Sequence, residues 1–470
     1  MRIRCGTLIL AALGVAGCKP SDVLSVPAPS GVTSSTTLKS QAGAEAAFKG
    51  AKGQLFLANG SIFYGTTMWS ELMSDDYTQS GFSFGAGYDA RFTAVPGGSN
   101  ELYSDVGWGN ILQAHSGLLL AIPLLSQYEP ASGQQMVGEA YALAGYAELM
   151  LGETFCAGTP LDRALPGGQY AYGTPLTTDS MLATAEAHFD SAIASANGDP
   201  TVLGLARVGL GRALLGRGQY AAADTAVATV PTSFVYNISL VAAANIFPPN
   251  GTFIAAAMGQ PFYRMFNVGD HEGGAGLNYA SANDPRVVVD SSLTAGDGGQ
   301  WILDTKFEND LTDIALSTGV EARLIQAEAA QQRGDPTWVT DLSALRTDDA
   351  DTHVTFDPTM SEVPLLADST TTLPAAAQVD FLFRERAFWL FGTGVRLGDM
   401  RRLLRQYGRD PATVYPNGPY DATHPLVGAG YASYGSDVSI TLPTPAGLIS
   451  NQITVTNPEY KGCLTSTATP

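Results

Sequence analysis

Residues 203–227 read LGLARVGLGRALLGRGQYAAADTAV, and no other stretch of the 470-residue chain indicates its fold class so directly. Gly218, Tyr220 and Ala223 have the Gly-x-Tyr-x-x-Ala spacing of a tetratricopeptide helix pair. Gly218 permits a tight turn, Tyr220 packs across it, and the small Ala223 lets two helices approach closely. The stretch therefore predicts a helix over 203–215, a turn at Gly218 and a second helix from Tyr220 onward.

Two further helix pairs are predicted from apolar residues that recur three or four positions apart. Residues 134–153 are expected to pair with 178–196, where Thr178-Asp179-Ser180 resembles a helix cap. Residues 321–333 are expected to pair with 338–345 across a Gly-Asp-Pro turn. The predicted fold class is mainly α, with tetratricopeptide-like helical pairs in an α/α superhelix.

Other segments complete this organisation. Further helices are predicted from Gln41 onward and over residues 108–125, 379–389 and 398–407. Residues 438–442 alternate in the manner of a short strand. Two segments rich in glycine, proline and polar residues, about 60–105 and 231–310, are predicted to be large loop insertions in one domain covering 41–470.

The N-terminus has the pattern of a bacterial lipoprotein signal. Arg2 and Arg4 precede an apolar run over 8–15, which is too short to span a bilayer and ends in Val-Ala-Gly-Cys18. We expect residues 1–17 to be removed, Cys18 to be lipidated, and residues 18–40 to form a flexible tether. Each buried methylene of an acyl chain contributes about 0.8 kcal/mol to membrane attachment. The alternative is an ordinary secretory signal with an incidental cysteine.

The charge of the chain argues against some ligand classes. The formal net charge of −19 becomes −21 once Arg2 and Arg4 are removed, and such an acidic protein repels the phosphates of nucleic acids. The most apolar segment, 111–125, contains Gln113, His115 and Pro123, and is interpreted as a buried helix. We therefore expect no nucleic-acid partner and contact with a membrane only through the lipid anchor.

Two cysteines remain after the signal and the lipidation site. Cys156 and Cys463 form one even pair in an exported, oxidising context, and we predict a disulfide between them. Such a bridge would tie the C-terminal tail to the helical body. The alternative is two small, buried, reduced side chains.

The motifs of catalytic and metal sites are weak in this sequence. Gly81-Phe82-Ser83-Phe84-Gly85 matches Gly-x-Ser-x-Gly, but it lacks the strand and helix that flank a nucleophile elbow. The five histidines are dispersed without the spacing of a metal motif, so neither a metal nor a cofactor is expected. The acidic groups Asp75-Asp76, Asp348-Asp349 and Asp351 leave a glycoside hydrolase as an open alternative.

Aromatic residues in the predicted loops are the leading ligand-binding candidates, because flat rings suit the apolar faces of sugars. The first insertion contains a crowd of them: Phe63, Tyr64, Trp69, Tyr77, Phe82, Phe84, Tyr88, Phe92 and Tyr103. The candidates for ligand contact are Tyr64, Trp69, Tyr77, Phe82, Phe84, Tyr88, Tyr279 and Trp301. Packing against the scaffold is an equal alternative for each ring.

Several short motifs recur in a fixed order along almost the whole mature chain. They are DVLSVP (22–27), ELMSDD (71–76), YAELMLGETF (146–155), NDPR (283–286), EARLIQAEA (321–329), Glu385-Arg386 followed by Gly394-x-Arg396-x-x-Asp399-Met400-x-Arg402, and LPTP (442–445), Asn451 and NPEY (457–460). In this order they resemble the motifs of the SusD/RagB family of surface lipoproteins. The chain departs from the family signature at Trp389, Thr393 and Leu403.

The resemblance implies an α-helical fold on tetratricopeptide-like pairs, with a ligand face built from loop insertions. It also implies a non-catalytic lid over a TonB-dependent outer-membrane transporter, facing the cell surface, that captures an oligosaccharide or a peptide and passes it on. The shared signature is interpreted as structural, so no ligand residue transfers by motif. The alternatives are a helical-repeat protein–protein scaffold and, less favoured, a glycoside hydrolase.

Overall fold

The computed structural model describes residues 38–60, 65–79, 85–93, 99–165, 169–238, 266–287, 289–290, 303–304, 313–347, 368–420, 424–428 and 430–442. The expected signal peptide and lipidation site, Cys18 included, lie outside these ranges. Within these ranges, none of the helices combines the length and the apolar character that a membrane span requires.

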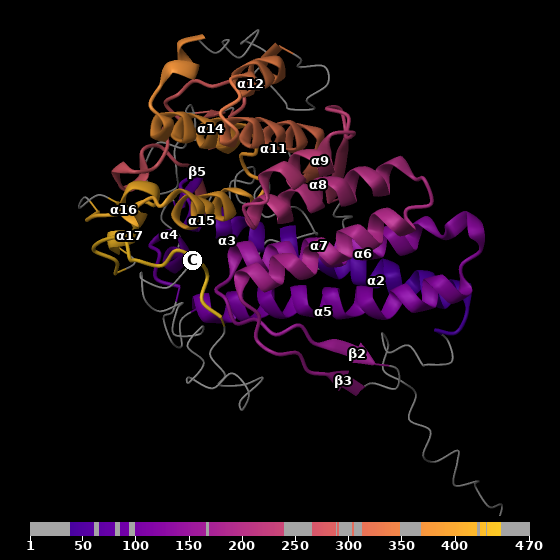
Figure 1. Ribbon diagram of the computed structural model, residues 1–470. Coiled ribbons are helices and arrows are strands. Elements are labelled where there is room, and N and C mark those ends of the chain that lie inside the picture. The colour runs from indigo at the N-terminus through magenta and orange to yellow at the C-terminus, as the bar shows by residue number, and fades with distance from the viewer. Residues whose placement is uncertain are drawn as a thin grey trace, which may run out of the picture.

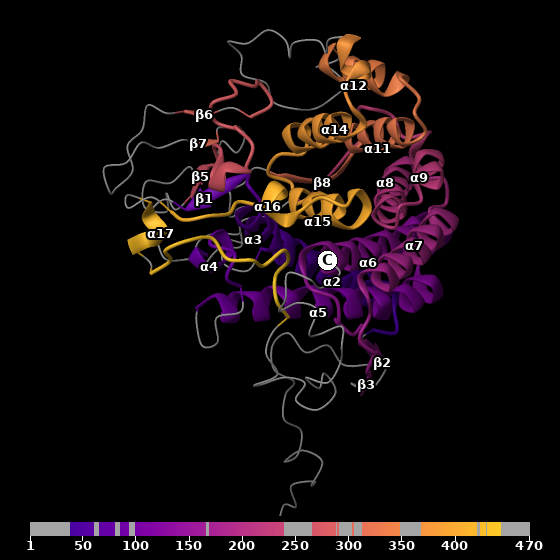
Figure 2. The same cartoon turned by 60° about the vertical axis from the view of Figure 1, so that its left-hand side comes forward.

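A stack of helices forms the body of the molecule, rising from α2 and α5 at the base to α12 at the top of Figures 1 and 2. Successive neighbours in contact are α2 (Gln41–Gly60), α5 (Ser99–Tyr128), α6 (Gln135–Thr154), α7 (Thr178–Ser195), α8 (Pro200–Gly216), α9 (Tyr220–Val227) and α11 (Gly319–Gln332). The last of these packs against α12 (Thr337–Thr347) and α14 (Ala375–Trp389). Such nearest-neighbour packing is typical of helical-repeat proteins.

The three predicted helix pairs are confirmed as α6 with α7, α8 with α9, and α11 with α12. Gly218 and Gly334 occupy the turns of the last two pairs with φ of +72° and +71°, a backbone conformation that favours glycine. The mainly α fold class predicted from the sequence is therefore confirmed.

Side-chain caps fix where several of these helices begin. The hydroxyl of Thr177 accepts a hydrogen bond from the Ser180 backbone at 3.0 Å, so the cap of α7 lies one residue before the predicted Thr178. Asp199 accepts from Thr201 and Val202 ahead of α8, whose first residue is Pro200. An N-cap of this kind typically contributes about 1 kcal/mol.

Glycines on α6 and α8 make room for a single ring at the centre of the stack. Phe189 of α7 is fully buried, and a Cβ atom would lie 2.8 Å from its ring at Gly145 and 2.3 Å at Gly209. The ring also meets Tyr146 edge to face, at 5.3 Å between centroids. The close approach of α6, α7 and α8 thus depends on the absence of side chains at two positions.

Short elements from distant parts of the chain surround the helix stack (Figure 2). Those from the first half are α3 (Thr66–Met73), β1 (Tyr77–Gln79), α4 (Ala86–Asp89), η1 (Ala131–Gly133), β2 (Arg163–Leu165), β3 (Gln169–Ala171) and β4 (Val235–Ile238). Those from the second half are β5 (Phe266–Val268), η2 (Glu272–Gly274), β6 (Val289–Asp290), β7 (Leu303–Asp304), β8 (Ile314–Thr318), η3 (Asp368–Thr372), α15 (Arg396–Tyr407), α16 (Pro411–Val414) and α17 (Pro425–Gly428).

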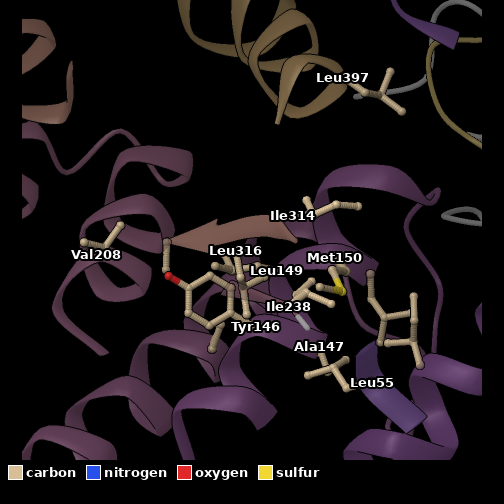
Figure 3. Close-up of a cluster of buried hydrophobic side chains, with 14 of the residues drawn as sticks. Leu55, Tyr146, Ala147, Leu149, Met150, Val208, Ile238, Ile314, Leu316 and Leu397 are labelled. Carbon is tan, nitrogen blue, oxygen red and sulfur yellow. The ribbon is translucent and has the colours of Figure 1, made fainter. Parts of the chain in front are cut away.

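The strands form two-stranded antiparallel ladders, two of which join distant segments. Tyr77 of β1 is opposite Val268 of β5, and Val235 of β4 is opposite Thr318 of β8. β8 and β4 also cover α6, and Figure 3 shows Leu316, Ile314 and Ile238 beside Tyr146 and Leu149.

Two sequence-based expectations about these segments are wrong. Residues 60–105, predicted to be loop, contain α3, β1, α4 and the first turns of α5. Their aromatic and small residues gave no clear helical period, but the tertiary contacts order them. The predicted strand over 438–442 is a single parallel bridge between Ile440 and Phe155, because the segment crosses the end of α6 instead of joining a sheet.

Ion pairs among the motif residues hold α11, α14 and α15 together in the interior. Arg402 reaches both carboxylate oxygens of Glu328, at 2.5 and 3.0 Å, and Arg386 binds Asp399 at 2.7 Å. Burial alone would raise the pKa of Asp399, but the charges of Arg386 and Arg402 outweigh it and lower that pKa. Arg286 binds Glu385 at 2.9 Å. These motif residues therefore serve the fold.

Candidate functional site

Four of the eight aromatic ligand candidates lie in the core. Trp69, Tyr77, Tyr88 and Tyr279 are at most 1% exposed, so the structure contradicts a ligand-contacting role for them. Trp69 stacks on Tyr88 at 4.8 Å, and Tyr77 and Tyr279 both pack against Phe391 at 5.0 Å. Trp69, Tyr77 and Tyr88 belong to α3, β1 and α4, and Tyr279 to the segment after η2, so these rings fill the space between packed elements.

The other aromatic candidates stay predictions. Tyr64, Phe82, Phe84 and Trp301 lie outside the described residues.

Cys156 is disulfide-bonded. Since Cys463 also lies outside the described residues, its predicted pairing with Cys156 stays a prediction too.

The first insertion meets the C-terminal segment where α4 lies near α17 (Figure 2). Partly exposed rings gather there. Phe92 is 39% exposed and stacks on Tyr431, with 5.7 Å between centroids and 26° between planes. Tyr420 stacks on His424 at 4.3 Å and 22°. Leu426 lies beneath Tyr420 and Tyr431 in one apolar cluster with α4. We call Phe92, Tyr420, His424 and Tyr431 the aromatic platform.

Anchors on both sides of Phe92 hold this ring in place. Arg91 and Thr93 are only 3% and 2% exposed. The Arg91 guanidinium lies 4.6 Å over the ring of Tyr415 and donates to the Asp437 carbonyl at 2.8 Å. The Asp437 carboxylate accepts from the Thr93 backbone and hydroxyl, at 2.7 and 2.9 Å. The backbone of Phe92 is therefore fixed, so little conformational entropy is lost when a ligand binds to its ring.

A glycine permits the close approach of the two segments. A Cβ at Gly435 would lie 2.3 Å from the Arg91 carbonyl oxygen, and the Gly435 backbone donates to Ala90 at 2.7 Å. Sequence reasoning missed this platform because its members come from residue 92 and from residues 420–431. Phe92 is one of many aromatic residues in the first insertion, and the sequence around Tyr420, His424 and Tyr431 has no motif that indicates a ligand site.

Two carboxylates lie behind the platform. Asp89 accepts from the Gln79 backbone at 2.6 Å, and Glu272 accepts from the Tyr434 hydroxyl at 2.8 Å. Burial raises the pKa of both, and the nearby charge of Glu272 adds to the effect on Asp89. Their hydrogen bonds support the backbone and Tyr434, which is a structural role.

Of the carboxylates that the sequence offered for glycosidase chemistry, the described pair does not flank a cleft. Asp75 and Asp76 are fully buried, and Asp75 is bound to Arg396. Asp348, Asp349 and Asp351 lie outside the described residues.

A polar cavity of about 330 Å³ lies between α9, α11 and α12. Its charged lining residues include Arg323, Arg333, Asp224 and Asp341. Arg333 is paired with Asp224 at 2.8 Å, and Arg323 donates to the Val230 carbonyl at 2.6 Å. None of the described residues that line the cavity is aromatic, and the two arginines are matched by the two aspartates.

One group of metal-ligating side chains converges in the described part of the chain. His115, Glu148 and His188 have potential ligand atoms within 4.8 Å of one another. The sequence-based reasoning treated the histidines as dispersed, and it missed this group because its members are 33 and 40 positions apart. Helix packing, which local spacing does not encode, brings them together.

Comparisons with known proteins identify the fold. No family model matches the sequence, and no curated protein matches it. Solved structures do match. A SusD-like carbohydrate-binding protein from Bacteroides vulgatus aligns with a TM-score of 0.56 and 18% identity, over 77% of this chain and 83% of that one. A SusD superfamily protein from Bacteroides thetaiotaomicron gives 0.56 and 13%, over 81% and 95%.

A third match is a surface glycan-binding protein A from Bacteroides thetaiotaomicron, solved in complex with laminarihexaose. It aligns with a TM-score of 0.58 and 12% identity, over 86% of this chain and 96% of that one. The chain therefore has the SusD-like fold, and the fold implied by the motif resemblance is confirmed.

Proposed function

We propose that this chain is a non-catalytic, lipid-anchored binding protein of the SusD/RagB type that captures an oligosaccharide at the cell surface. The observation that carries the proposal is the exposed Phe92 ring, stacked on Tyr431 and fixed by buried neighbours on both sides. A rigid aromatic face binds the apolar face of a sugar with little loss of side-chain entropy.

Polar groups beside the rings complete a glycan-binding surface. His424 and the Tyr431 hydroxyl belong to the platform itself, whereas the Tyr420 hydroxyl is buried beneath it. Such groups exchange hydrogen bonds with sugar hydroxyls. The laminarihexaose complex of a protein with the same fold supports a glycan as the ligand class.

Delivery to a TonB-dependent outer-membrane transporter is the second part of the proposal. It rests on the motif resemblance together with the shared fold. The test is co-purification of the lipidated protein with outer-membrane barrels from its native membrane. Recovery without a TonB-dependent barrel would contradict this part and leave glycan capture standing.

A hydrolytic role is less well supported. Asp89 and Glu272 are the paired carboxylates nearest the platform, but Asp89 is only 3% exposed and both are engaged in hydrogen bonds within the protein. We therefore expect binding without cleavage. Release of reducing ends from a bound polysaccharide would contradict this expectation.

The experiment that tests glycan capture is affinity electrophoresis of the purified protein through gels containing plant and microbial polysaccharides. We expect retardation by at least one polysaccharide and reduced retardation of Phe92→Ala. Retardation by none of them, together with binding of peptides, would favour the peptide ligand that the resemblance leaves open.

A further inference from the structure

Three helices each contribute one side chain to a buried cluster within the stack. His115 comes from α5, Glu148 from α6 and His188 from α7, which lie side by side in Figure 1. Nε2 of His115 lies 2.8 Å from one Glu148 oxygen, and Nδ1 of His188 lies 2.9 Å from both. The two imidazole rings meet at an angle of 61°, with 6.1 Å between centroids.

We infer that His115, Glu148 and His188 form a binding site for a divalent transition-metal ion, with Zn²⁺ as the best fit. Two imidazole nitrogens and one carboxylate oxygen are a common protein ligand set for zinc, with a fourth position left to water. Tetrahedral zinc with bonds of about 2.0–2.1 Å needs ligand atoms about 3.3 Å apart. The separations in the structure, 2.8 and 2.9 Å to Glu148 and within 4.8 Å overall, lie on either side of that spacing.

The electrostatics of the cluster favour a cation. The side chain of Glu148 is 0% exposed, and in the described chain the only side chains in ion-pair range of it are the two histidines. A buried carboxylate with no arginine or lysine beside it requires compensating positive charge. A metal ion supplies that charge, and both histidines then bind it in their neutral form.

Unsatisfied bonding capacity at His115 is an independent observation. Nδ1 of His115 is buried and has no hydrogen-bond partner among the described residues, in a side chain that is 2% exposed. The three side chains therefore do not satisfy one another completely. The side chain of His188 is 19% exposed, which gives an ion a route to the cluster from the surface.

A metal ion bound at this site would cross-link three helices. One ion would join α5, α6 and α7, which otherwise meet through apolar and small side chains. The near-complete burial of His115 and Glu148 leaves no room for a substrate, so the role is structural. This inference is independent of glycan capture, because the aromatic platform belongs to different elements.

Metal titration of the untagged full chain, purified in detergent and treated with a chelator, tests the site. We expect isothermal titration calorimetry with ZnCl₂ to show one saturable site per chain and an increase in the unfolding midpoint. Replacement with Co²⁺ is expected to give the visible absorption of a four-coordinate ion. Absence of a saturable one-to-one site would overturn the inference.

Variants separate this site from incidental binding. His188→Ala removes the partly exposed ligand and is expected to weaken Zn²⁺ binding at least about hundredfold and to abolish the Co²⁺ spectrum. Glu148→Gln tests the buried ligand while preserving its volume. The matched control His271→Ala, at an exposed loop residue, is expected to bind Zn²⁺ as the unmodified chain does. Binding by folded His188→Ala with unchanged affinity would overturn the inference.

Discussion

Arg396 and Asp75 form a two-point ion pair across 321 positions of the chain, with Nε 2.7 Å from Oδ1 and Nη2 3.0 Å from Oδ2. Both residues are buried, and Asp75 also accepts from the Leu277 backbone at 2.7 Å. The pair fastens α15 to the turn after α3, and through Leu277 it also fixes the segment after β5. One arginine–carboxylate contact thus joins three separate parts of the chain.

Removing one partner of this pair is expected to destabilise the protein strongly. Asp75→Asn removes the carboxylate that pairs with the buried Arg396, which typically costs about 3–5 kcal/mol of unfolding free energy. Asp380→Asn is the matched control, because Asp380 pairs with Arg409 and its side chain is 63% exposed. The control is expected to change the unfolding free energy by less than about 1 kcal/mol. Urea unfolding measures both, and equal effects would contradict the assignment.

Asp76 is expected to make stability fall as pH rises. Burial raises the pKa of Asp76 to about 6 from 3.8, and neither carboxylate oxygen has a hydrogen-bond partner among the described residues. The folded state therefore binds a proton more tightly than the unfolded state, and stability is lost between about pH 4 and pH 6.

Asp76→Asn removes that loss. We expect the variant to be more stable than the unmodified protein at pH 8, by up to about 3 kcal/mol, and the difference to vanish near pH 4. Chemical unfolding of both proteins across this range measures the difference at each pH. A difference that is independent of pH would contradict the raised pKa.

The packing of Phe189 predicts that a helix-favouring substitution will destabilise the protein. Gly209→Ala places a Cβ 2.3 Å from this buried ring, and the resulting overpacking typically costs about 1–3 kcal/mol. Gly53→Ala in α2 meets no atom within 4 Å, so it is expected to stabilise by up to about 1 kcal/mol. Thermal unfolding should move the two midpoints in opposite directions. A higher midpoint for Gly209→Ala would show that the ring can shift without cost.

The helix pairs could be predicted from the sequence because their signals are local. Two local signals, apolar residues at helical spacing and a glycine at the turn, predict the pairs α8 with α9 and α11 with α12. The short elements between residues 66 and 89 could not be predicted in this way. They are ordered by contacts with distant segments, such as the pairing of Tyr77 with Val268.

The candidate sites were harder to predict than the fold, since each is assembled from distant residues. Trp69 and Tyr88 were considered as ligand contacts because they were expected in a loop, yet they stack on each other in the core. Phe92 differs from them only through the tertiary contacts that leave its ring exposed. His115 and His188 similarly become neighbours only when α5, α6 and α7 pack together.

Isothermal titration calorimetry with the polysaccharide that retards the protein most tests glycan capture by the aromatic platform most directly. The unmodified chain is compared with Phe92→Ala and with Tyr172→Ala, an aromatic residue 70% exposed after β3 and outside the platform. Loss of a stacked ring typically costs about 1–3 kcal/mol, so we predict affinity to fall about 5- to 150-fold for Phe92→Ala and to stay unchanged for Tyr172→Ala. Unchanged affinity of folded Phe92→Ala would contradict the account.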